Sequence, residues 1–558
     1  MKILLTGINS KYIHSNLAIR YLKAYTKDLD AECIIREYTI NDRMENILES
    51  IIKEKADVVA FSCYIWNMEY VNQLSKLIKL VDENIEILYG GPEVSFDSTA
   101  VLEENPGEYV ISGEGEETFR DFVLYKLNQK EINRIKGLTY RNKDGEIINN
   151  GIRENMNMEN LVFPYEEDEN LDNKIVYYEA SRGCPFGCKY CLSSTEHRVR
   201  FLDIERVKKE LMYFINKKVK LVKFVDRTFN CRHDFSMAIW KFLIDQDTET
   251  KFHFELSADL LSDDEIALLN TAPKNRFQFE VGVQTTNEQV LKNIHRYVKF
   301  DRLKSKVLGI ERGKNIDQHL DLIVGLPGED YKSFRNSFND VYSLRPEVVQ
   351  IGFLKLLKGA AMRDEAKLWG MKYSPYAPYE VLRTNCVSYD EIVELKKVDE
   401  MVDKYYNSGK FKNIVNYLLP KFETPFDFYL ALARFYDEKG YFNKSIGNVE
   451  YYNVFHEFNM SELNGECQDI FDEIIKYDYL MFNKKRWLPP FLTRHLEKEE
   501  EREIKEELRG NEPFKRMHIE KYSINMKEYL EKGSIKNEYY YLIYDEDTAE
   551  KVEYKKNI

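Results

Sequence analysis

The stretch EASRGCPFGCKYCLSS, residues 179–194, contains three cysteines within eight residues. Cys184 is followed by Cys188 and then Cys191, and the aromatic Tyr190 directly precedes the last of them. Cysteine thiolates hold iron–sulfur clusters, and a cluster of four irons takes four ligands. Three closely spaced thiolates without a nearby fourth partner therefore predict a 4Fe-4S cluster with one open iron, which can bind a substrate or a cofactor.

Other sites built from cysteines fit this stretch less well. A structural zinc site needs four ligands, usually in two pairs, and the nearest candidates, His197 and Cys231, make no familiar pairing. A disulfide with a spare cysteine suits a secreted chain, whereas the opening MKILLTGINSKY predicts no secretory segment. A ferredoxin-type electron carrier would use a fourth cysteine.

The cysteine spacing, with an aromatic before the last cysteine, resembles the signature of the radical S-adenosylmethionine (SAM) superfamily. The resemblance implies that Cys184, Cys188 and Cys191 hold the cluster and that the amino and carboxyl groups of SAM chelate its fourth iron. It also implies that one electron cleaves SAM to a 5′-deoxyadenosyl radical.

Length and composition limit the class of protein. A chain of 558 residues predicts two or three domains, and no apolar run approaches the roughly 20 residues that span a bilayer. Eight cysteines fit a reduced, cytoplasmic setting better than a disulfide framework. The net charge of −14 makes nucleic acid an unexpected partner. Basic clusters at residues 296–306 and 484–486 are best explained as solvated surface.

The first 125 residues alternate strand-like and helix-like segments and predict a doubly wound α/β domain with a parallel sheet. Ligands of such sheets bind outside the carboxyl ends of the strands. The loops expected there cover residues 7–14, 62–67, 90–95 and 113–116. Residues 126–172 are predicted to form a connector with a hairpin that turns at residues 143–145.

The βα alternation resumes over residues 173–388 and predicts a partial (β/α) barrel. Its six strands are expected at residues 175–180, 221–226, 252–258, 277–283, 319–324 and 348–353. The cysteines then lie on the first βα loop, at the end of the barrel where active sites are built. Residues 389–558 are predicted to form a mostly helical domain that ends in a small hairpin.

An α/β domain with the strings GGPE and SGEGEE, ahead of a cluster-binding barrel, resembles the cobalamin-binding class of radical SAM enzymes. The opening INSKYIHSNLAIRYL and the helical tail resemble an uncharacterised subgroup of that class. The resemblance implies a corrin over the sheet's carboxyl edge, and glycine allows close backbone approach. The expected cobalamin contacts are Gly90, Gly91, Gly113, Gly115, Tyr64, Trp66 and Asn67.

Two observations leave the cobalamin prediction open. The string Asp-x-His-x-x-Gly, which supplies a cobalt ligand in many cobalamin enzymes, is absent, and His14 is the only histidine in this region. Binding without a histidine ligand is common in the radical SAM class. A bare α/β scaffold domain remains an alternative because fold alone does not fix function, and Trp66 could instead pack against the barrel.

Several strand ends of the barrel resemble the SAM-binding positions of the superfamily. The predicted contacts are Asp226, Glu255, Glu280, Gln284 and Gly325. A helix cap explains Asp226 equally well, and an ordinary Pro-Gly turn explains the loop after Gly325. Glu280 and Gln284 share one strand face by period two, and buried polar groups in a barrel indicate a ligand. Arg296 resembles an arginine that often follows the fourth strand, although a surface charge explains it as well.

Together the motifs and the resemblance predict a cobalamin-dependent radical SAM enzyme, and the resemblance implies a transferase that methylates an unactivated carbon, because this reaction is frequent in the family. Family relatives also perform rearrangements and cyclisations, so these reactions are alternatives. A methylthiotransferase would need three more cluster cysteines in the first domain, where only Cys33 and Cys63 occur. A non-catalytic corrinoid or redox sensor is another alternative. The expected partners are a small-molecule or peptide substrate and an electron donor such as flavodoxin or ferredoxin, and no membrane is expected.

Overall fold

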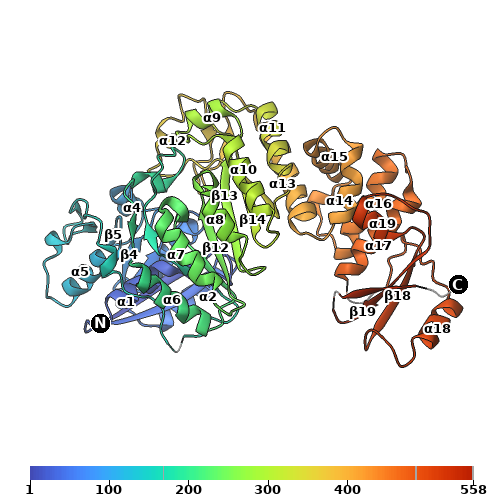
Figure 1. Ribbon diagram of the computed structural model, residues 1–558. Coiled ribbons are helices and arrows are strands. Elements are labelled where there is room, and N and C mark those ends of the chain that lie inside the picture. Colours follow the sequence, from blue (N-terminus) through green and yellow to red (C-terminus); the bar gives the residue numbers. More distant parts are fainter. Residues whose placement is uncertain (168, 484–486, 549, 556–558) are drawn as a thin grey trace. The chain divides into compact units, whose positions relative to one another are not determined.

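The computed structural model describes residues 1–167, 169–483, 487–548 and 550–555, so the basic cluster at 484–486 lies outside the described residues. The chain divides into two compact units. The first contains Met1–Ser337 and Ile351–Tyr389, and the second contains Phe338–Gln350 and Asp390–Ile558. Each unit is coloured along the sequence in Figure 1. No helix among the described residues has both the length and the apolar character needed to cross a membrane.

The first sheet is the predicted doubly wound sheet of the N-terminal domain. Its strand order is β2-β1-β3-β4-β5-β6-β7, with β1 to β5 parallel and β6 and β7 antiparallel at one edge. The strands are β1 (Lys2–Asn9), β2 (Glu32–Thr39), β3 (Val58–Ser62), β4 (Glu86–Gly90), β5 (Tyr109–Ile111), β6 (Leu138–Arg141) and β7 (Ile147–Asn149). The β6–β7 hairpin, expected inside a connector, therefore extends this sheet.

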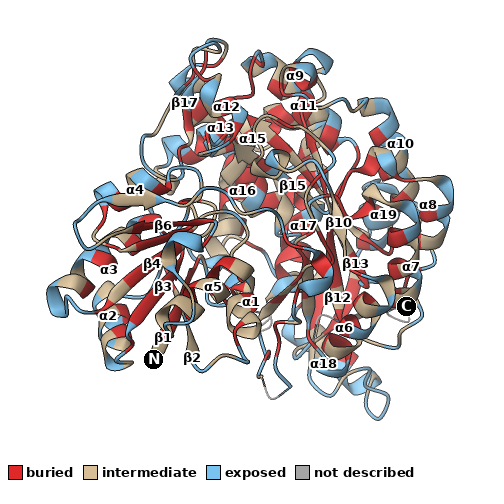
Figure 2. Ribbon diagram, turned by 90° about the vertical axis from the view of Figure 1, so that its left-hand side faces the viewer, coloured by how far each residue is buried: buried red, intermediate tan, exposed pale blue. Residues whose placement is uncertain are grey.

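Helices cover both faces of this sheet because the strands are apolar on both sides. The helices are α1 (Leu17–Tyr25), α2 (Met44–Lys53), α3 (Met68–Val81), α4 (Ser98–Glu104) and α5 (Glu116–Lys126). Apolar residues of α2, α3 and α4 form one core cluster, and those of α1 and α5 form a second cluster with the other strand faces. In Figure 2 the strands β3 and β4 are mostly buried, while α2 and α3 also show exposed residues.

The second sheet is the predicted partial barrel, with strand order β15-β14-β13-β12-β11-β8. Its strands are β8 (Ile175–Tyr178), β11 (Leu221–Phe224), β12 (Lys251–Leu256), β13 (Phe277–Gln284), β14 (Asp317–Val324) and β15 (Val348–Phe353). The helices between them are α6 (Ile204–Asn216), α7 (His233–Ile244), α8 (Asp263–Leu269), α9 (Glu288–Asn293), α10 (Phe300–Glu311) and α11 (Tyr331–Tyr342). The six strands agree with the predicted ones to within a few residues.

Buried and partly buried residues alternate along β13 and β14. Apolar side chains such as Phe277 and Phe279 are fully buried on one face of β13, and Glu280 and Gly282 lie on the other. Period two places the polar residues of neighbouring strands on one common face. This face is the wall of the candidate site.

After the last barrel strand, a short segment completes the first unit. It contains α12 (Ala361–Asp364) and the antiparallel pair β16 (Lys372–Tyr373) and β17 (Val381–Arg383). Glu93, in the GGPE loop of the N-terminal domain, accepts a hydrogen bond from the hydroxyl of Tyr379 and lies 3.5 Å from the Lys358 ammonium. This segment therefore holds that loop against the rest of the unit.

The second unit is mostly helical, as predicted, and has a small antiparallel sheet. Its helices are α13 (Tyr389–Val402), α14 (Lys412–Leu418), α15 (Pro425–Glu438), α16 (Asn448–Glu462), α17 (Gln468–Phe482), α18 (Lys498–Glu507) and α19 (Met526–Lys532). The sheet consists of β18 (Met517–Tyr522), β19 (Tyr540–Asp545) and β20 (Lys551–Tyr554), in that order. The predicted terminal hairpin corresponds to β19 and β20, and β18 is a third strand that the sequence did not reveal.

Candidate functional site

The cysteine loop leaves the barrel directly after β8 and is closed at its base by two short strands. β9 (Ser181–Arg182) pairs antiparallel with β10 (Arg200–Phe201), so the residues between them form one loop. Gly183 has a φ of +101°, and a Cβ there would collide with the Arg198 backbone, so glycine is required. The Cys184 N–H donates to the Glu196 carbonyl at 3.2 Å, and the Lys189 N–H donates to the Ile294 carbonyl at 3.1 Å.

All three cysteines line one cavity at the carboxyl ends of the barrel strands. The cavity encloses about 710 Å³, including the part that opens to solvent. Cys184 and Cys188 are buried, whereas Cys191 is partly exposed. The loop also contributes Phe186, Tyr190 and Ser194 to the lining.

The donor set fits a cluster better than a single ion. Across the described ranges, no three His, Cys, Asp or Glu side chains gather closely enough to hold one metal ion. A structural zinc site would bring four ligands to one point, whereas a four-iron cluster takes each thiolate on a different iron. Three thiols spread around one cavity therefore suit a cluster with an open iron.

The barrel strands add polar side chains to the same cavity. β12 supplies Glu255, and β13 supplies Glu280, Gly282 and Gln284. Glu255 lies beside Glu280 in the parallel register, and Gly282 lies beside Asp321 of β14. The predicted SAM contacts Glu255, Glu280 and Gln284 thus come together on the cavity wall.

Gln284 has an unusual backbone conformation. Its φ is +71°, and the register between β13 and β14 shifts between Gly282 and Gln284. The shift is a bulge, which re-aims the side chain at the end of the strand. A positive φ in a residue other than glycine costs free energy, and such strain clusters at functional sites. This position therefore supports a ligand contact at Gln284.

Two buried acceptors in this wall lack partners. The Asp321 Oδ1 and Gln284 Oε1 atoms make no hydrogen bond with any described residue. Buried polar atoms are almost always paired, so an orphaned pair in a cavity indicates a ligand with matching donors. Asp321 was not predicted as a contact, although an acid within the apolar run of β14 is itself a signal.

The three carboxyl groups of the wall differ in their ionisation. Burial would raise the pKa of Glu280, but hydrogen bonds from His253 and Lys223 outweigh it and lower that pKa. Burial raises the pKa of Glu255, against the opposing effect of Arg227. Burial raises the pKa of Asp321 strongly, and the charges of Glu280 and Glu255 add to this effect. The wall therefore carries one firmly ionised carboxylate and two that resist ionisation.

Two arginines supply positive charge to the cavity. The Arg296 guanidinium donates to the Gly282 carbonyl at 2.6 Å and contacts the Cys188 Sγ at 3.8 Å. Burial raises the pKa of the Cys188 thiol, and Arg296 works against this effect. Arg227 follows β11 and lies 3.8 Å from Glu255. Arg296 is thus part of the lining rather than a surface charge, and Arg227 is a lining residue that the sequence did not reveal.

Two predicted SAM contacts lie outside the cavity lining. The Asp226 carboxylate is buried and accepts hydrogen bonds from the Ala180 N–H at 3.0 Å and the Ser181 hydroxyl at 2.5 Å. It therefore anchors the start of the cysteine loop. Gly325 has a φ of +86°, and a Cβ there would lie 2.7 Å from a Val381 methyl. Gly325 forms a tight turn packed on β17, so neither residue lines this cavity, and their contact with SAM stays a prediction.

The carboxyl edge of the first sheet gathers the loops predicted to meet a corrin. The parallel register aligns Gly7, Ser62, Gly90 and Ile111 across four strands. A Cβ added to Gly113 would have no atom within 4 Å, and a Cβ added to Gly90 would meet only one atom, at 3.9 Å. These two glycines leave room for a flat ligand.

Other predicted residues at this edge have structural partners instead. Gly91 has a φ of +119°, and a Cβ there would lie 2.5 Å from the Cys63 carbonyl oxygen. A Cβ on Gly115 would touch Leu22 at 3.4 Å, an ordinary contact. Asn67 is fully buried, and its amide bonds the carbonyls of Ile8 and Ser62, so it holds its own loop. Gly91 and Asn67 therefore have structural roles at this edge, and contact of the three residues with a cobalamin stays a prediction.

Tyr64 and Trp66 form a flat aromatic surface at the same edge. Their rings stack with centroids 4.4 Å apart and an interplanar angle of 7°. Trp66 is 43% exposed, and its indole N–H donates to the Ile8 carbonyl at 3.1 Å. An exposed, tethered indole is available to a planar ligand.

The GEGE loop of the N-terminal domain reaches the cysteine loop through ion pairs. The Arg182 guanidinium of β9 lies 2.8 Å from Glu116 and 3.4 Å from Glu114. Arg200 of β10 also pairs with Glu114. The His14 Nδ1 lies 2.6 Å from the Tyr177 hydroxyl of β8, so His14 touches the barrel. The two predicted cofactor sites therefore belong to one connected framework.

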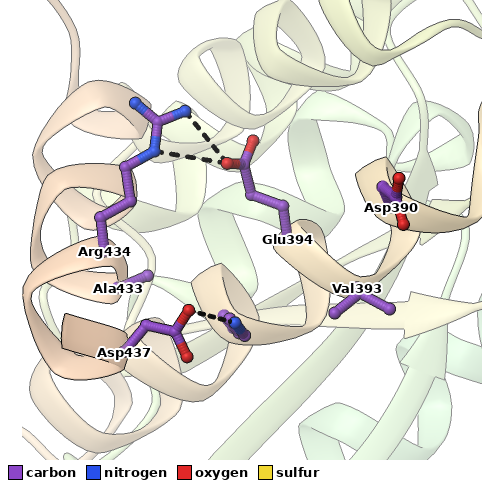
Figure 3. Close-up of a pocket in the computed structure, with 7 residues that line it drawn as sticks. Asp390, Val393, Glu394, Ala433, Arg434 and Asp437 are labelled. Carbon is purple, nitrogen blue, oxygen red and sulfur yellow. Dashed lines mark hydrogen bonds and ion pairs between the residues drawn. The ribbon is translucent and has the colours of Figure 1, made fainter. Parts of the chain in front are cut away.

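A shallow hollow in the second unit lies between α13 and α15 (Figure 3). Arg434 pairs with Glu394 at 3.0 Å, and Lys397 pairs with Asp437 at 2.8 Å. These ion pairs cross from one helix to the other, so the charges of this hollow stabilise the helix pair. Exposed pairs of this kind contribute about 0–1 kcal/mol each.

Glu329, at the end of the loop after β14, gives a pH-dependent prediction. Burial raises its pKa to about 7, although the hydroxyls of Thr285, Ser333 and Ser337 donate to its Oε1 atom. Because a glutamate in the unfolded chain has a pKa of about 4.5, the folded state loses stability progressively as the pH rises from about 4.5 to about 7. We expect Glu329→Gln to gain stability relative to the parent between about pH 5 and about pH 8. Thermal unfolding across this range measures the difference, and a difference that stays constant with pH would contradict the assignment.

Comparison with known proteins identifies the two domains of the first unit. Residues 178–341 match the family described as "Radical SAM superfamily", and residues 3–123 match "B12 binding domain". The chain thus contains a radical SAM domain and a B12-binding domain. Residues 367–553 match a family described as "Protein of unknown function (DUF4080)". The two named domains imply a 4Fe-4S cluster with SAM and a cobalamin, and radical SAM enzymes generally need a reductant and a substrate.

Curated relatives of this radical SAM protein include methyltransferases. It is 28% identical over 228 residues to "Uncharacterized methyltransferase PH0819" of Pyrococcus horikoshii, a match that covers 38% of this chain and 49% of the relative. It is 24% identical over 355 residues to "Cobalamin-dependent radical SAM methyltransferase TokK" of Streptomyces tokunonensis, covering 58% and 50%. The chain thus spans about half the length of these relatives.

Solved structures show the same fold at low identity. The cobalamin-dependent radical enzyme OxsB matches with a TM-score of 0.58 and 14% identity, over 91% of this radical SAM protein and 75% of that chain. The methyltransferase TsrM of Kitasatospora setae, solved with cobalamin and a 4Fe-4S cluster, matches with a TM-score of 0.56 and 14% identity, covering 68% and 78%. The predicted architecture is confirmed by these matches.

Proposed function

We propose that this chain is a cobalamin-dependent radical SAM enzyme. It cleaves SAM reductively to a 5′-deoxyadenosyl radical and methylates an unactivated carbon of a small-molecule or peptide substrate. The observation that carries this proposal is the shared cavity, in which three cysteine thiols face polar groups from β12, β13 and β14. The names of the curated relatives favour methylation over rearrangement or cyclisation.

Each cofactor is assigned to residues of this chain. Cys184, Cys188 and Cys191 would hold the cluster, and the wall formed by Glu255, Glu280, Gln284 and Asp321 would orient SAM through its hydroxyl and ammonium groups. The open glycine edge and the Tyr64–Trp66 stack would receive the corrin. When bound, these cofactors supply the electron, the radical and the methyl group. The protein's task is to position them and to exclude water.

The charges of the wall suit this task. The ionised Glu280 offers an acceptor to a cationic or hydroxyl-bearing ligand, and Lys223 and His253 hold its carboxylate in place. The Asp321 and Gln284 side chains each have one unpaired acceptor oxygen. A ligand can donate a hydrogen bond to each of these atoms without breaking an existing hydrogen bond within the protein. Arg296 keeps a positive charge beside Cys188, which favours the thiolate form that binds iron.

The chain is proposed to act in the cytoplasm, where thiols stay reduced. Flavodoxin or ferredoxin is proposed as the electron donor.

Anaerobic purification and reconstitution test the proposal. Metal, sulfide and corrin analysis report on the two bound cofactors, and incubation with SAM and dithionite reports on the reaction. We expect 5′-deoxyadenosine from reductive cleavage and S-adenosylhomocysteine from methyl removal. Cluster-replete protein that forms no 5′-deoxyadenosine would overturn the enzyme proposal. Formation of 5′-deoxyadenosine without S-adenosylhomocysteine would overturn methylation and favour rearrangement or cyclisation.

A further inference from the structure

A basic stretch of sequence lies directly against the cysteine loop. Residues 292–306 contain six lysines and arginines and one acid, within a chain whose net charge is −14. The stretch joins the end of α9 to the start of α10. The Ile294 carbonyl accepts the Lys189 N–H at 3.1 Å, and Arg296 contacts the Cys188 Sγ at 3.8 Å. The basic stretch is thus attached to the loop that carries the three cysteines.

This attachment brings the protein surface close to a cluster ligand. Arg296 lines the cavity, whereas the next residue, Tyr297, is 76% exposed. Consecutive Cα atoms lie about 3.8 Å apart. A partner that touches Tyr297 is therefore one residue away from the side chain that contacts Cys188. The backbone of Lys189 in the cysteine loop bonds Ile294, next to α9, and Met362 of α12. Figures 1 and 2 both place α9 and α12 at the same end of the first unit.

Four exposed side chains of this stretch form what we call the basic rim: Lys292, His295, Lys299 and Arg302. Lys292, Lys299 and Arg302 make no ion pair with any residue that the structure describes, whereas Lys306 is neutralised by Asp263 at 2.7 Å. The rim charges are therefore available to an external partner.

We infer that the basic rim docks an acidic one-electron carrier protein, with carboxylates around its redox centre, and orients that centre toward the cluster. This inference rests on the proposed function. An acidic carrier and a chain with a net charge of −14 repel each other as wholes. A local positive patch beside the cysteine loop offsets this repulsion at that place only. The carrier is therefore favoured in the orientation that brings its redox centre close to the cluster. The reduced carrier loses one electron and the cluster gains it, and no bond forms or breaks.

Charge reversal at the rim tests the inference. In the double variant Lys292→Glu/Lys299→Glu, we expect the affinity for flavodoxin, an acidic FMN protein, to fall at least about tenfold at low ionic strength. Raising the salt concentration is expected to weaken the parent's binding because screening lengths shrink to about 10 Å at 0.1 M. Binding is measured directly, by titration of labelled flavodoxin, and separately from turnover.

A matched variant controls for net charge. Lys241→Glu/Lys274→Glu makes the same change at exposed lysines of α7 and of the loop before β13, at the opposite end of that strand from the cysteines. We expect this control to bind flavodoxin as the parent does. With dithionite as reductant, both variants are expected to keep their iron content and their rate of 5′-deoxyadenosine formation within about twofold, because dithionite needs no docking surface.

The outcomes separate this inference from the proposed function. Equal flavodoxin affinity for the rim variant and the parent would overturn docking at the rim, as would a parent that binds no flavodoxin at low salt. A parent that forms no 5′-deoxyadenosine with dithionite would overturn the proposed function instead. Loss of both binding and flavodoxin-driven turnover in the rim variant alone supports the inference.

Discussion

A Cys188→Ala variant is expected to lose the cluster and with it the cleavage of SAM. Cys188 is buried in the cavity wall and contacts Arg296, so alanine removes a thiolate that no neighbouring group replaces. Mutation of a residue that only hydrogen-bonds a metal ligand typically lowers activity by up to roughly 100-fold. Loss of a ligand itself should cost more, so we expect the rate of 5′-deoxyadenosine formation to fall by more than this. Iron content after anaerobic reconstitution is expected to fall well below about four per chain. Both quantities are measured on the full chain, with dithionite as reductant.

Cys231→Ala provides the matched control for this prediction. Cys231 is also a free, partly buried cysteine in the first unit, but it does not line the cavity. We expect this variant to keep its iron and its rate within about twofold, since surrounding contacts change little. If Cys231→Ala loses the cluster while Cys188→Ala keeps it, the ligand assignment is wrong.

A Lys476→Met variant is expected to destabilise the second unit by about 3–5 kcal/mol. The Lys476 ammonium is fully buried on α17 and lies 3.0 Å from Glu473 and 3.5 Å from Glu520 of β18. It also donates to the carbonyls of Thr493 and Lys521, each at 3.1 Å. Methionine keeps most of the volume of the lysine's aliphatic chain. It removes the charge, however, so two buried carboxylates lose the cation that they share.

Hydrogen exchange of the full chain measures this loss within the second unit. Amides of α17 and β18 are expected to lose roughly 10²- to 10⁴-fold of their protection. Lys505→Met is the control, because Glu501 is the one acid that pairs with Lys505 among the described residues, on the half-exposed surface of α18. It is expected to change protection by less than about 0.5 kcal/mol. Adding Glu473→Gln and Glu520→Gln to Lys476→Met should restore part of the protection, and no restoration would contradict the charge explanation.

The fold of the first unit follows from local patterns. The barrel strands are short segments with apolar residues at alternate positions, and the cysteine spacing is contained within eight residues. Period two alone places Glu280 and Gly282 on one face, and the structure puts that face in the cavity. These features depend on neighbours in the chain, so the sequence is sufficient to predict them.

Other features depend on partners that are distant in the sequence. The Asp226 carboxylate follows a strand, where a ligand contact is reasonable, but it accepts hydrogen bonds from Ala180 and Ser181, which lie 46 and 45 residues away in the sequence. Asn67 similarly bonds Ile8 across the sheet. A polar residue at a strand end can face a ligand or fasten a neighbouring loop, and only the three-dimensional packing distinguishes the two.

The second unit was predicted less completely. Helix α16 is rich in Asn, Tyr and Phe, residues with modest helix propensity. It forms because aromatic side chains such as Phe455 pack against Tyr405 and Phe411. Strand β18 was missed because its partner β19 follows only after α19. In both cases tertiary contacts outweigh the local preference.

The pairing of β9 with β10 has a consequence for how the holoprotein matures. The ends of the cysteine loop are fixed by backbone hydrogen bonds and by Gly183, none of which involves a thiol. The chain can therefore complete its folding before iron and sulfide arrive, and delivery needs only the mouth of the cavity. Loss of the cluster through oxygen damage would then leave the barrel folded. The same polypeptide could therefore bind a new cluster instead of being degraded.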